Sequence, residues 1–291
     1  MTTLKVKNKR TLIQVIILIT VIIAELSHNS NIFHYICPIC GVSSIYQFFV
    51  SSTLWVVKLK SLLGITIGIV VILTILFGPI LCGFICPFGT VQDLVAKLGK
   101  KIFKRKYNNF ISGNLDSKMK YIRYISLGLT ITITSVSTGV IFLEKINPYH
   151  AFLGIFTKSI SILGLFILFI VILLSFFVQR PWCRYICPYG ALLGIFNQFK
   201  VFRIVRNKNT CIGCKKCSNT CPMGIDVHVN DEVRDLSCIS CLECVSDNVC
   251  PKERTVFLTS KDLDKVILDE NEINLISILD NSVEVKTSNC R

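Results

Sequence analysis

The chain has 291 residues, 52% of them hydrophobic, and its mean hydropathy is +0.59. This composition argues against an ordinary soluble domain. The formal charge of +14 is uneven, because 23 Lys and Arg but only four Asp and Glu precede Cys211, whereas nine basic and 14 acidic residues follow from there. Since the positive excess lies in the apolar part, membrane topology explains it better than nucleic-acid binding, and no nucleic-acid partner is expected.

Four apolar segments, at residues 11–26, 61–81, 124–143 and 159–178, are predicted to be transmembrane helices; the last three have about the 20 apolar residues that a span needs, and the first is shorter. The first is interpreted as an uncleaved span, because AELSHNSN offers no small-x-small cleavage site. Basic residues gather at the N-terminus, at 97–123 and after residue 180. By the positive-inside rule, this pattern predicts a multi-pass protein of the cell membrane with both termini in the cytoplasm.

The apolar part repeats itself. Each half contains a span, an apolar outer loop with a proline, a second span and a CxxxCP motif, which reads CGFICPFG in the first half and CRYICPYG in the second. Both halves begin on the same side, which indicates a parallel repeat. The expected fold is a membrane all-α domain over residues 1–208, with four helices in a 2+2 repeat.

The strongest motif is Cys211-x2-Cys214-x2-Cys217-x3-Cys221-Pro, followed by Cys238-x2-Cys241-x2-Cys244-x5-Cys250-Pro. Three closely spaced thiolates can surround one iron–sulfur cube, while the cysteine before proline reaches the other cube. One 4Fe–4S cluster is thus expected on Cys211, Cys214, Cys217 and Cys250, and a second on Cys238, Cys241, Cys244 and Cys221. Zinc is the alternative, although it rarely uses this spacing.

These cysteines define a small α+β ferredoxin-like module at residues 209–255. Residues 256–291 form an acidic tail, for which pairing onto the module and disorder are both open. The spacing before Cys250 departs from the usual pattern, with five intervening residues where three are common.

The predicted spans, CGFICPFG, CRYICPYG and the eight ferredoxin cysteines together resemble the NapH/MauN-type membrane polyferredoxins, over residues 1 to about 255. They are also similar to the C-terminal half of NosR-type flavoproteins. The resemblance implies a quinol dehydrogenase-type electron-transfer subunit of a larger oxidoreductase system, which exchanges electrons between quinone and a ferredoxin-, flavin- or haem-type partner. It does not identify that partner, and it names no catalytic residue.

The four cysteines of the CxxxCP motifs are Cys82, Cys86, Cys183 and Cys187. Cysteines at i and i+4 share one helical face, and the following proline ends that helix or begins another. A parallel repeat would bring the two pairs together. They then form an additional iron–sulfur or metal site, a pair of redox-active thiols, or a structural site.

A third group, Cys37, Cys40 and His34, lies in the predicted outer loop. It is interpreted either as interfacial packing or as a disulfide or metal site. A copper site there would favour a second function, an assembly or regulatory factor for a metalloenzyme, because the chain also resembles CcoG-type copper-reducing maturation proteins.

Overall fold

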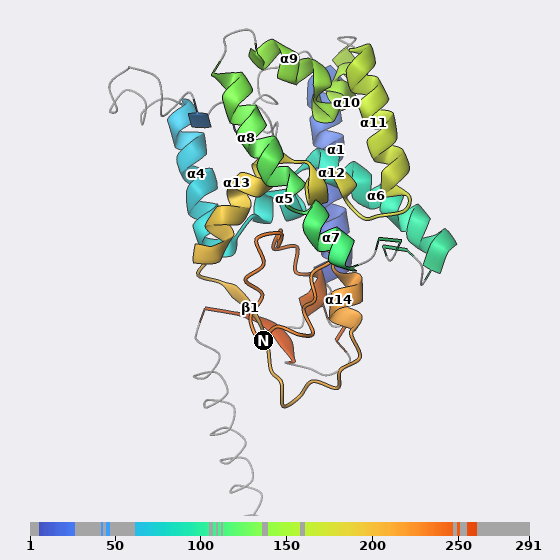
Figure 1. Cartoon of the computed structure of the whole chain (residues 1–291), viewed down its shortest axis with the longest axis vertical. Coiled ribbons are helices and arrows are strands. Elements are labelled where there is room, and N and C mark those ends of the chain that lie inside the picture. Colours follow the sequence, from blue (N-terminus) through green and yellow to red (C-terminus); the bar gives the residue numbers. More distant parts are fainter. Residues whose placement is uncertain are drawn as a thin grey trace, which may run out of the picture.

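The computed structural model of the chain describes residues 6–26, 42, 45–46, 62–104, 107–108, 110–111, 113–135, 139–157, 161–246, 249–250 and 255–260. Its helices and strands, labelled as in Figure 1, are α1 (Val6–Leu26), α4 (Leu62–Phe77), α5 (Ile80–Phe84), α6 (Pro87–Phe103), α7 (Gly113–Met119), α8 (Ile122–Thr134), α9 (Gly139–Ile146), α10 (Pro148–Thr157), α11 (Ile162–Ser175), α12 (Pro181–Tyr185), α13 (Pro188–Phe196), η3 (Asn197–Phe199), β1 (Arg203–Arg206), α14 (Lys216–Thr220), η4 (Glu243–Val245) and β2 (Val256–Thr259).

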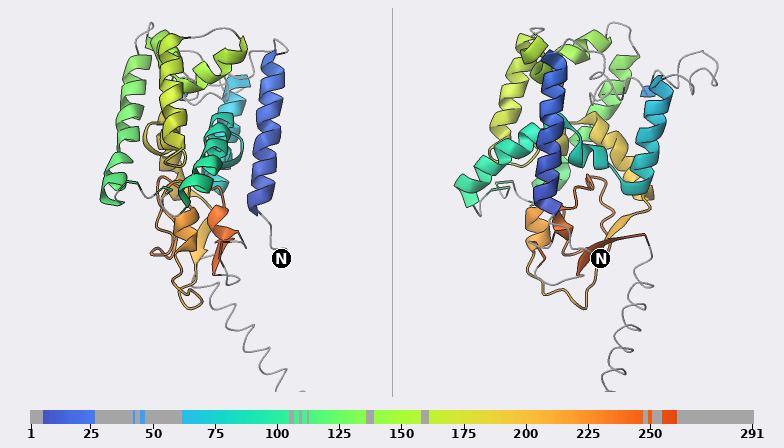
Figure 2. Two further views of the ribbon diagram at one scale, coloured as in Figure 1. Left: turned by 90° about the vertical axis from the view of Figure 1, so that its right-hand side faces the viewer. Right: turned by 180° about the vertical axis from the view of Figure 1, so that it is seen from behind.

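The longer helices stand side by side, and the cysteine-rich module is attached at one end of them (Figures 1 and 2). α10 packs against α11 and α1, and α8 packs against α13. In the module, β1 and β2 form a two-stranded antiparallel sheet with Arg203 opposite Thr259. The sheet thus joins residues on either side of the predicted module boundaries, 209 and 255, and the first residues of the predicted tail belong to it.

The predicted four-span membrane architecture is wrong. Each apolar segment contains a helix, but α4, α8 and α11 have only 16, 13 and 14 residues, whereas a spanning helix needs about 20. α1 has 21 residues, but Lys9 and Arg10 are among them. In the part of the chain that the structure describes, no helix is both long enough and apolar enough to cross a membrane. The predicted multi-pass topology, with both termini cytoplasmic, is therefore not supported.

Aromatic side chains beside the CxxxCP motifs organise the helical core. Phe88, directly after the proline of the first motif, is 1% exposed. Its ring lies edge to face with Tyr149 and with Trp182, at 6.5 Å between centroids in both pairs. Leu168 of α11 packs in the same cluster. Such aromatic pairs contribute about 0.5–1.5 kcal/mol beyond the area they bury. Because Trp182 belongs to the second motif region, this core fixes the two motifs to each other.

The buried carboxylate of Asp93 in α6 forms ion pairs with two guanidinium groups. The nearest nitrogen of Arg10 in α1 lies 2.6 Å from it, and that of Arg180, which is fully buried, lies 2.7 Å away. The side-chain amide of Gln179 donates a further hydrogen bond of 3.1 Å. Arg10 also pairs with Glu243 of η4 at 2.6 Å. α1, α6 and the cysteine-rich module therefore meet at one buried group of charges, called here the Asp93 cluster.

A second ion cluster centres on Asp116 of α7. Its carboxylate accepts hydrogen bonds from Arg184 and from the hydroxyl of Tyr185, both at 2.6 Å. Lys120 pairs with it at 3.1 Å and donates to the carbonyl of Gly224 in the module at 2.9 Å. Burial opposes ionisation of Asp116, but these partners outweigh it and hold the pKa of this carboxyl below its usual value.

Burial alone would raise the pKa of the Asp93 carboxyl. The charges of Arg180 and Arg10, with hydrogen bonds from Arg180 and Gln179, outweigh burial and hold this pKa well below its usual value. A carboxyl with a depressed pKa stabilises the fold above the pKa of the unfolded chain, about 3.9, and this stabilisation is lost as the pH falls through the folded pKa. The contribution of Asp93 is therefore fully present at neutral pH.

Replacement of Asp93 by Asn should destabilise the protein by about 3–5 kcal/mol, because Arg180 would keep no ion-pair partner among the described residues and Arg10 would keep only Glu243. Chemical unfolding followed by circular dichroism measures this change. Asp226→Asn, at an exposed position, is the control and should change stability by less than about 0.5 kcal/mol. Equal unfolding free energies for the two variants would contradict the role of the Asp93 cluster.

Candidate functional site

The two CxxxCP motifs have the same local structure. A five-residue helix holds the first cysteine, Cys82 in α5 and Cys183 in α12. The second cysteine, Cys86 or Cys187, is the N-cap of the next helix, with φ −60° and ψ 113° in both motifs. Proline suits the first helical position because its φ is already helical and it has no N–H to leave unpaired. The proline therefore begins a new helix, and the two cysteines of a motif do not share one face of a single helix.

All four motif cysteines line one cavity of about 230 Å³, called here the four-cysteine site. The cavity lies between the short helices and the module, and Cys238 of the module lines it too. Burial raises the pKa of Cys82 and Cys183 well above the usual value and that of Cys187 to about 12. Such thiols stay protonated unless a bound cation compensates the thiolate.

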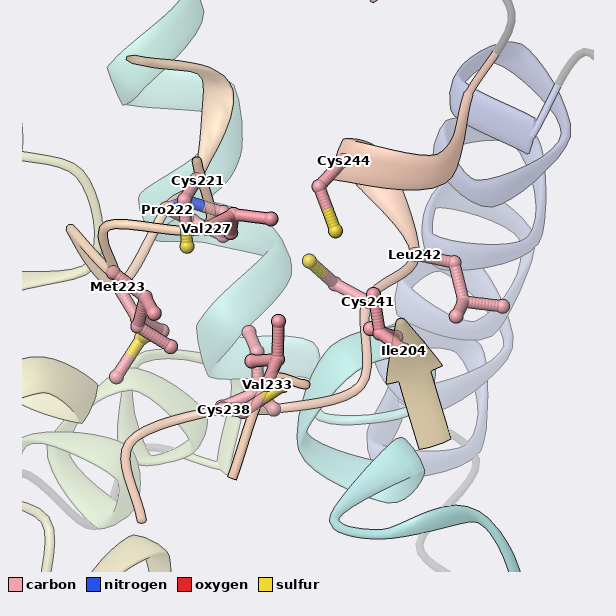
Figure 3. A pocket seen from close by; sticks show the side chains of 12 residues that line it. Ile204, Cys221, Pro222, Met223, Val227, Val233, Cys238, Cys241, Leu242 and Cys244 are labelled. Carbon is pink, nitrogen blue, oxygen red and sulfur yellow. The ribbon is translucent and has the colours of Figure 1, made fainter. Parts of the chain in front are cut away.

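A second cavity, called here the inner site, lies within the module against the helices. Four cysteines line it, and Figure 3 shows their sulfur atoms around the same space, with apolar side chains such as Val227 and Val233 between them. These cysteines are Cys221, Cys238, Cys241 and Cys244. All four are buried. Burial raises the pKa of Cys221 to about 12 and that of Cys241 to about 11.

A third cavity, called here the outer site, is lined by Cys211, Cys214, Cys217 and Cys250. Cys214 is exposed. Hydrogen bonds from the N–H of Gly213 and from Arg206 lower the pKa of Cys211. The outer site therefore faces solvent, in contrast to the inner site.

Cys221 follows the outer cysteines in the sequence but lines the inner site, and Cys250 follows the inner cysteines but lines the outer site. This exchange corresponds to the arrangement that the spacing predicts for cluster ligands, although the ligand assignment itself stays a prediction. Four sulfurs around a largely apolar space fit an iron–sulfur cube. Across the described residues, no three Cys, His, Asp or Glu side chains lie close enough together to hold a single metal ion. Cys37, Cys40 and His34 lie outside the described residues.

Several residues that shape these sites were not predicted from the sequence. Arg180 donates to the carbonyl of Cys82 at 2.6 Å, and Trp182 and Arg123 line the four-cysteine site. Asp93 is one of only four acidic residues before Cys211. A carboxylate in a basic, apolar region is a signal for a buried ion pair that could have identified it.

Family models match the chain in three places. A model described as a 4Fe-4S binding domain matches residues 61–106 and again 160–208, each of which includes one CxxxCP motif. A model described as a 4Fe-4S dicluster domain matches residues 203–251. These matches place the chain among iron–sulfur proteins.

Curated relatives have similar sequences. The putative electron transport protein YccM of Escherichia coli is 30% identical over 75% of this chain and 61% of its own length. The ferredoxin-type protein NapH of Haemophilus influenzae is 30% identical over 69% of each chain. The methylamine utilization ferredoxin-type protein MauN of Paracoccus denitrificans is 31% identical over 58% of this chain and 56% of its own. No solved structure matches the chain.

Taken with the cysteine-lined cavities, these matches define an iron–sulfur electron-transfer protein. The chain belongs to the NapH/MauN-type polyferredoxin family.

The inner site depends on a close approach of α5 to the loop between Cys238 and Cys241. A Cβ on Gly83 would lie 2.7 Å from the carbonyl oxygen of Ile239 and 3.2 Å from the Cα of Cys241. Both are backbone atoms, so relief of the clash requires the loop to move.

Gly83→Ala should therefore destabilise the protein by about 1–3 kcal/mol and reduce the iron bound per chain. Gly128→Ala in α8 is the matched control, because among the described residues nothing beyond its own helix backbone lies within 4 Å of its Cβ, and it should increase stability by up to about 1 kcal/mol. Thermal unfolding and iron analysis of the two variants test this difference. Equal iron contents and equal stabilities would show that the contact at Gly83 is unimportant.

Proposed function

We propose that the protein transfers electrons between quinone and a redox partner through three groups of cysteines. The inner and outer sites would each hold one 4Fe–4S cluster, and the four-cysteine site would hold a further iron–sulfur centre. The observation that carries the proposal is the position of Cys238, which lines both the inner site and the four-cysteine site. The two sites therefore share a wall.

In this proposal, residues 1–208 provide the quinone-reactive part and residues 209–255 the two clusters. Iron–sulfur clusters supply reversible electron transfer at potentials that the surrounding protein adjusts. The chain's own contribution is to hold the sulfurs, exclude water from the inner site and leave the outer site accessible.

The four-cysteine site also suits a quinone. Its walls are mostly apolar, with Ile69, Val70 and Phe88 among the lining residues. The indole N–H of Trp182 is buried and has no hydrogen-bond partner among the described residues, so it can donate to a carbonyl oxygen. Binding sites for small molecules commonly combine apolar walls with a few polar groups of this kind.

The outer faces of the helices support contact with a lipid surface, in which quinone dissolves. Large apolar side chains are exposed on several of them, including Ile72 of α4, Ile125 of α8 and Phe169 of α11, which are 58%, 70% and 65% exposed. Extensive exposed apolar surface marks a site of interaction with a membrane or another protein. The proposed localisation is therefore at a membrane.

A redox partner would exchange electrons at the outer site. Cys214 is exposed there, and so are the neighbouring Lys215 and Lys216. Positive charge beside the site favours encounter with an acidic surface on the partner.

Anaerobic reaction with a short-chain quinol tests the proposal. The quinol should bleach the visible iron–sulfur absorption of the purified protein. In Cys183→Ser, about four iron atoms per chain should be lost, because one thiolate ligand is missing from the four-cysteine site. Quinol should then reduce the remaining clusters much more slowly, whereas dithionite should still reduce them fully.

Dithionite reduction is the control for intact inner and outer sites. Wild-type protein that holds iron but does not react with quinol would contradict the quinone part of the proposal. Unchanged iron content in Cys183→Ser would contradict an iron–sulfur centre at the four-cysteine site.

A further inference from the structure

Arg123 of α8 is a buried cation without a carboxylate partner among the described residues. Arg123 is only 2% exposed. The guanidinium donates to the hydroxyl of Ser237 at 2.9 Å and to that of Tyr124 at 3.3 Å, and it lies 5.1 Å from the centre of the Tyr124 ring. Its Nε has no hydrogen-bond partner in the described part of the chain. All its observed partners are neutral.

Lys200, after η3, is a second buried cation of this kind. It is 2% exposed, and its Nζ has no partner within the described ranges. A Cβ placed on Gly78 would contact both the Lys200 side chain, at 3.4 Å from Cδ, and the hydroxyl of Ser240. The Lys200 side chain and the Ser240 hydroxyl therefore both lie on the side of Gly78 where a Cβ would project.

Both cations lie beside the segment that supplies two inner-site cysteines. Arg123 contacts Ser237, the residue before Cys238, and Lys200 lies near Ser240, the residue before Cys241. The nearby carboxylates have other described partners. Asp235 accepts from the backbone N–H of Ser237 at 2.6 Å, and Glu243 pairs with Arg10.

A buried unpaired cation is unfavourable unless negative charge lies nearby. An iron–sulfur cube held by four thiolates is an anion, and reduction makes it more negative. Positive charge beside it therefore favours the reduced form and raises its reduction potential. The outer site has a cation of its own, because Arg206 donates a hydrogen bond to Cys211.

We propose that the positive charges of Arg123 and Lys200 raise the reduction potential of the inner cluster. The inference rests on the proposed function, because it requires a cluster at the inner site.

Potentiometric titration of the full-length protein, followed by electron paramagnetic resonance, tests the inference. Arg123→Gln should shift the reduction equilibrium of the inner cluster at least tenfold toward the oxidised form. This lowers the inner potential by about 59 mV for one electron, and the outer potential should not change. Arg123→Lys keeps the charge and should restore most of the wild-type value. A Cys214→Ser variant assigns the outer signal.

Lys200→Met is the second, independent variant and should shift the inner potential in the same direction, whereas Lys200→Arg should not. If the Arg123→Gln protein does not retain the inner cluster, the inner potentials of Lys200→Met and Lys200→Arg test the inference instead. Two intact clusters with unchanged potentials in the charge-removing variants would overturn the inference alone. Wild-type protein without clusters would instead overturn the proposed function, and the inference with it.

Discussion

The Asp93 carboxylate is the centre of a buried ion-pair cluster that joins the helices to the cysteine-rich module. Arg10 connects it to Glu243 of the module, and Arg180 extends from it to the carbonyl of Cys82. Gln14 of α1 donates to the next carbonyl, that of Gly83, at 2.9 Å. Buried ion pairs add little net stability after desolvation, but breaking one is costly. Their main consequence here is geometric, because they fix the first CxxxCP motif relative to the inner site.

That geometry produces a gradient from buried to exposed sulfur. At the four-cysteine site and the inner site, burial raises the pKa of the thiols, so an iron–sulfur centre at either site would have to stabilise the thiolates. At the outer site, hydrogen bonds lower the pKa of Cys211, and Cys214 is exposed. An electron carrier benefits from this order, since the interior sites exclude water while the outer site remains accessible to a partner.

Cysteine spacing predicts that Cys221 and Cys250 are exchanged between the two clusters, and these residues line the inner and the outer cavity respectively, while the ligand assignment itself stays a prediction. Hydropathy located the helices but not their lengths. α4, for example, ends at Phe77, before Gly78 with φ 77° and Pro79, although the apolar run continues to residue 81. Gly-Pro is a strong local stop signal that hydropathy ignores.

The long-range ion pairs could not be predicted, because the partners of Asp93 are distant in the sequence and spacing carries no information about them. The i, i+4 pattern also predicted one helix per CxxxCP motif, where proline begins a second helix. The repeat itself was recognisable, since both motifs adopt the same backbone angles at the second cysteine.

The central claim is that three adjacent groups of cysteines hold iron. Anomalous scattering at the iron absorption edge, measured on crystals of anaerobically prepared protein, tests it most directly. We expect iron density at the inner site, the outer site and the four-cysteine site, with Cys221 bound at the inner site and Cys250 at the outer site. Iron absent from these cavities, or Cys221 and Cys250 each bound with its own sequence neighbours, would contradict the account.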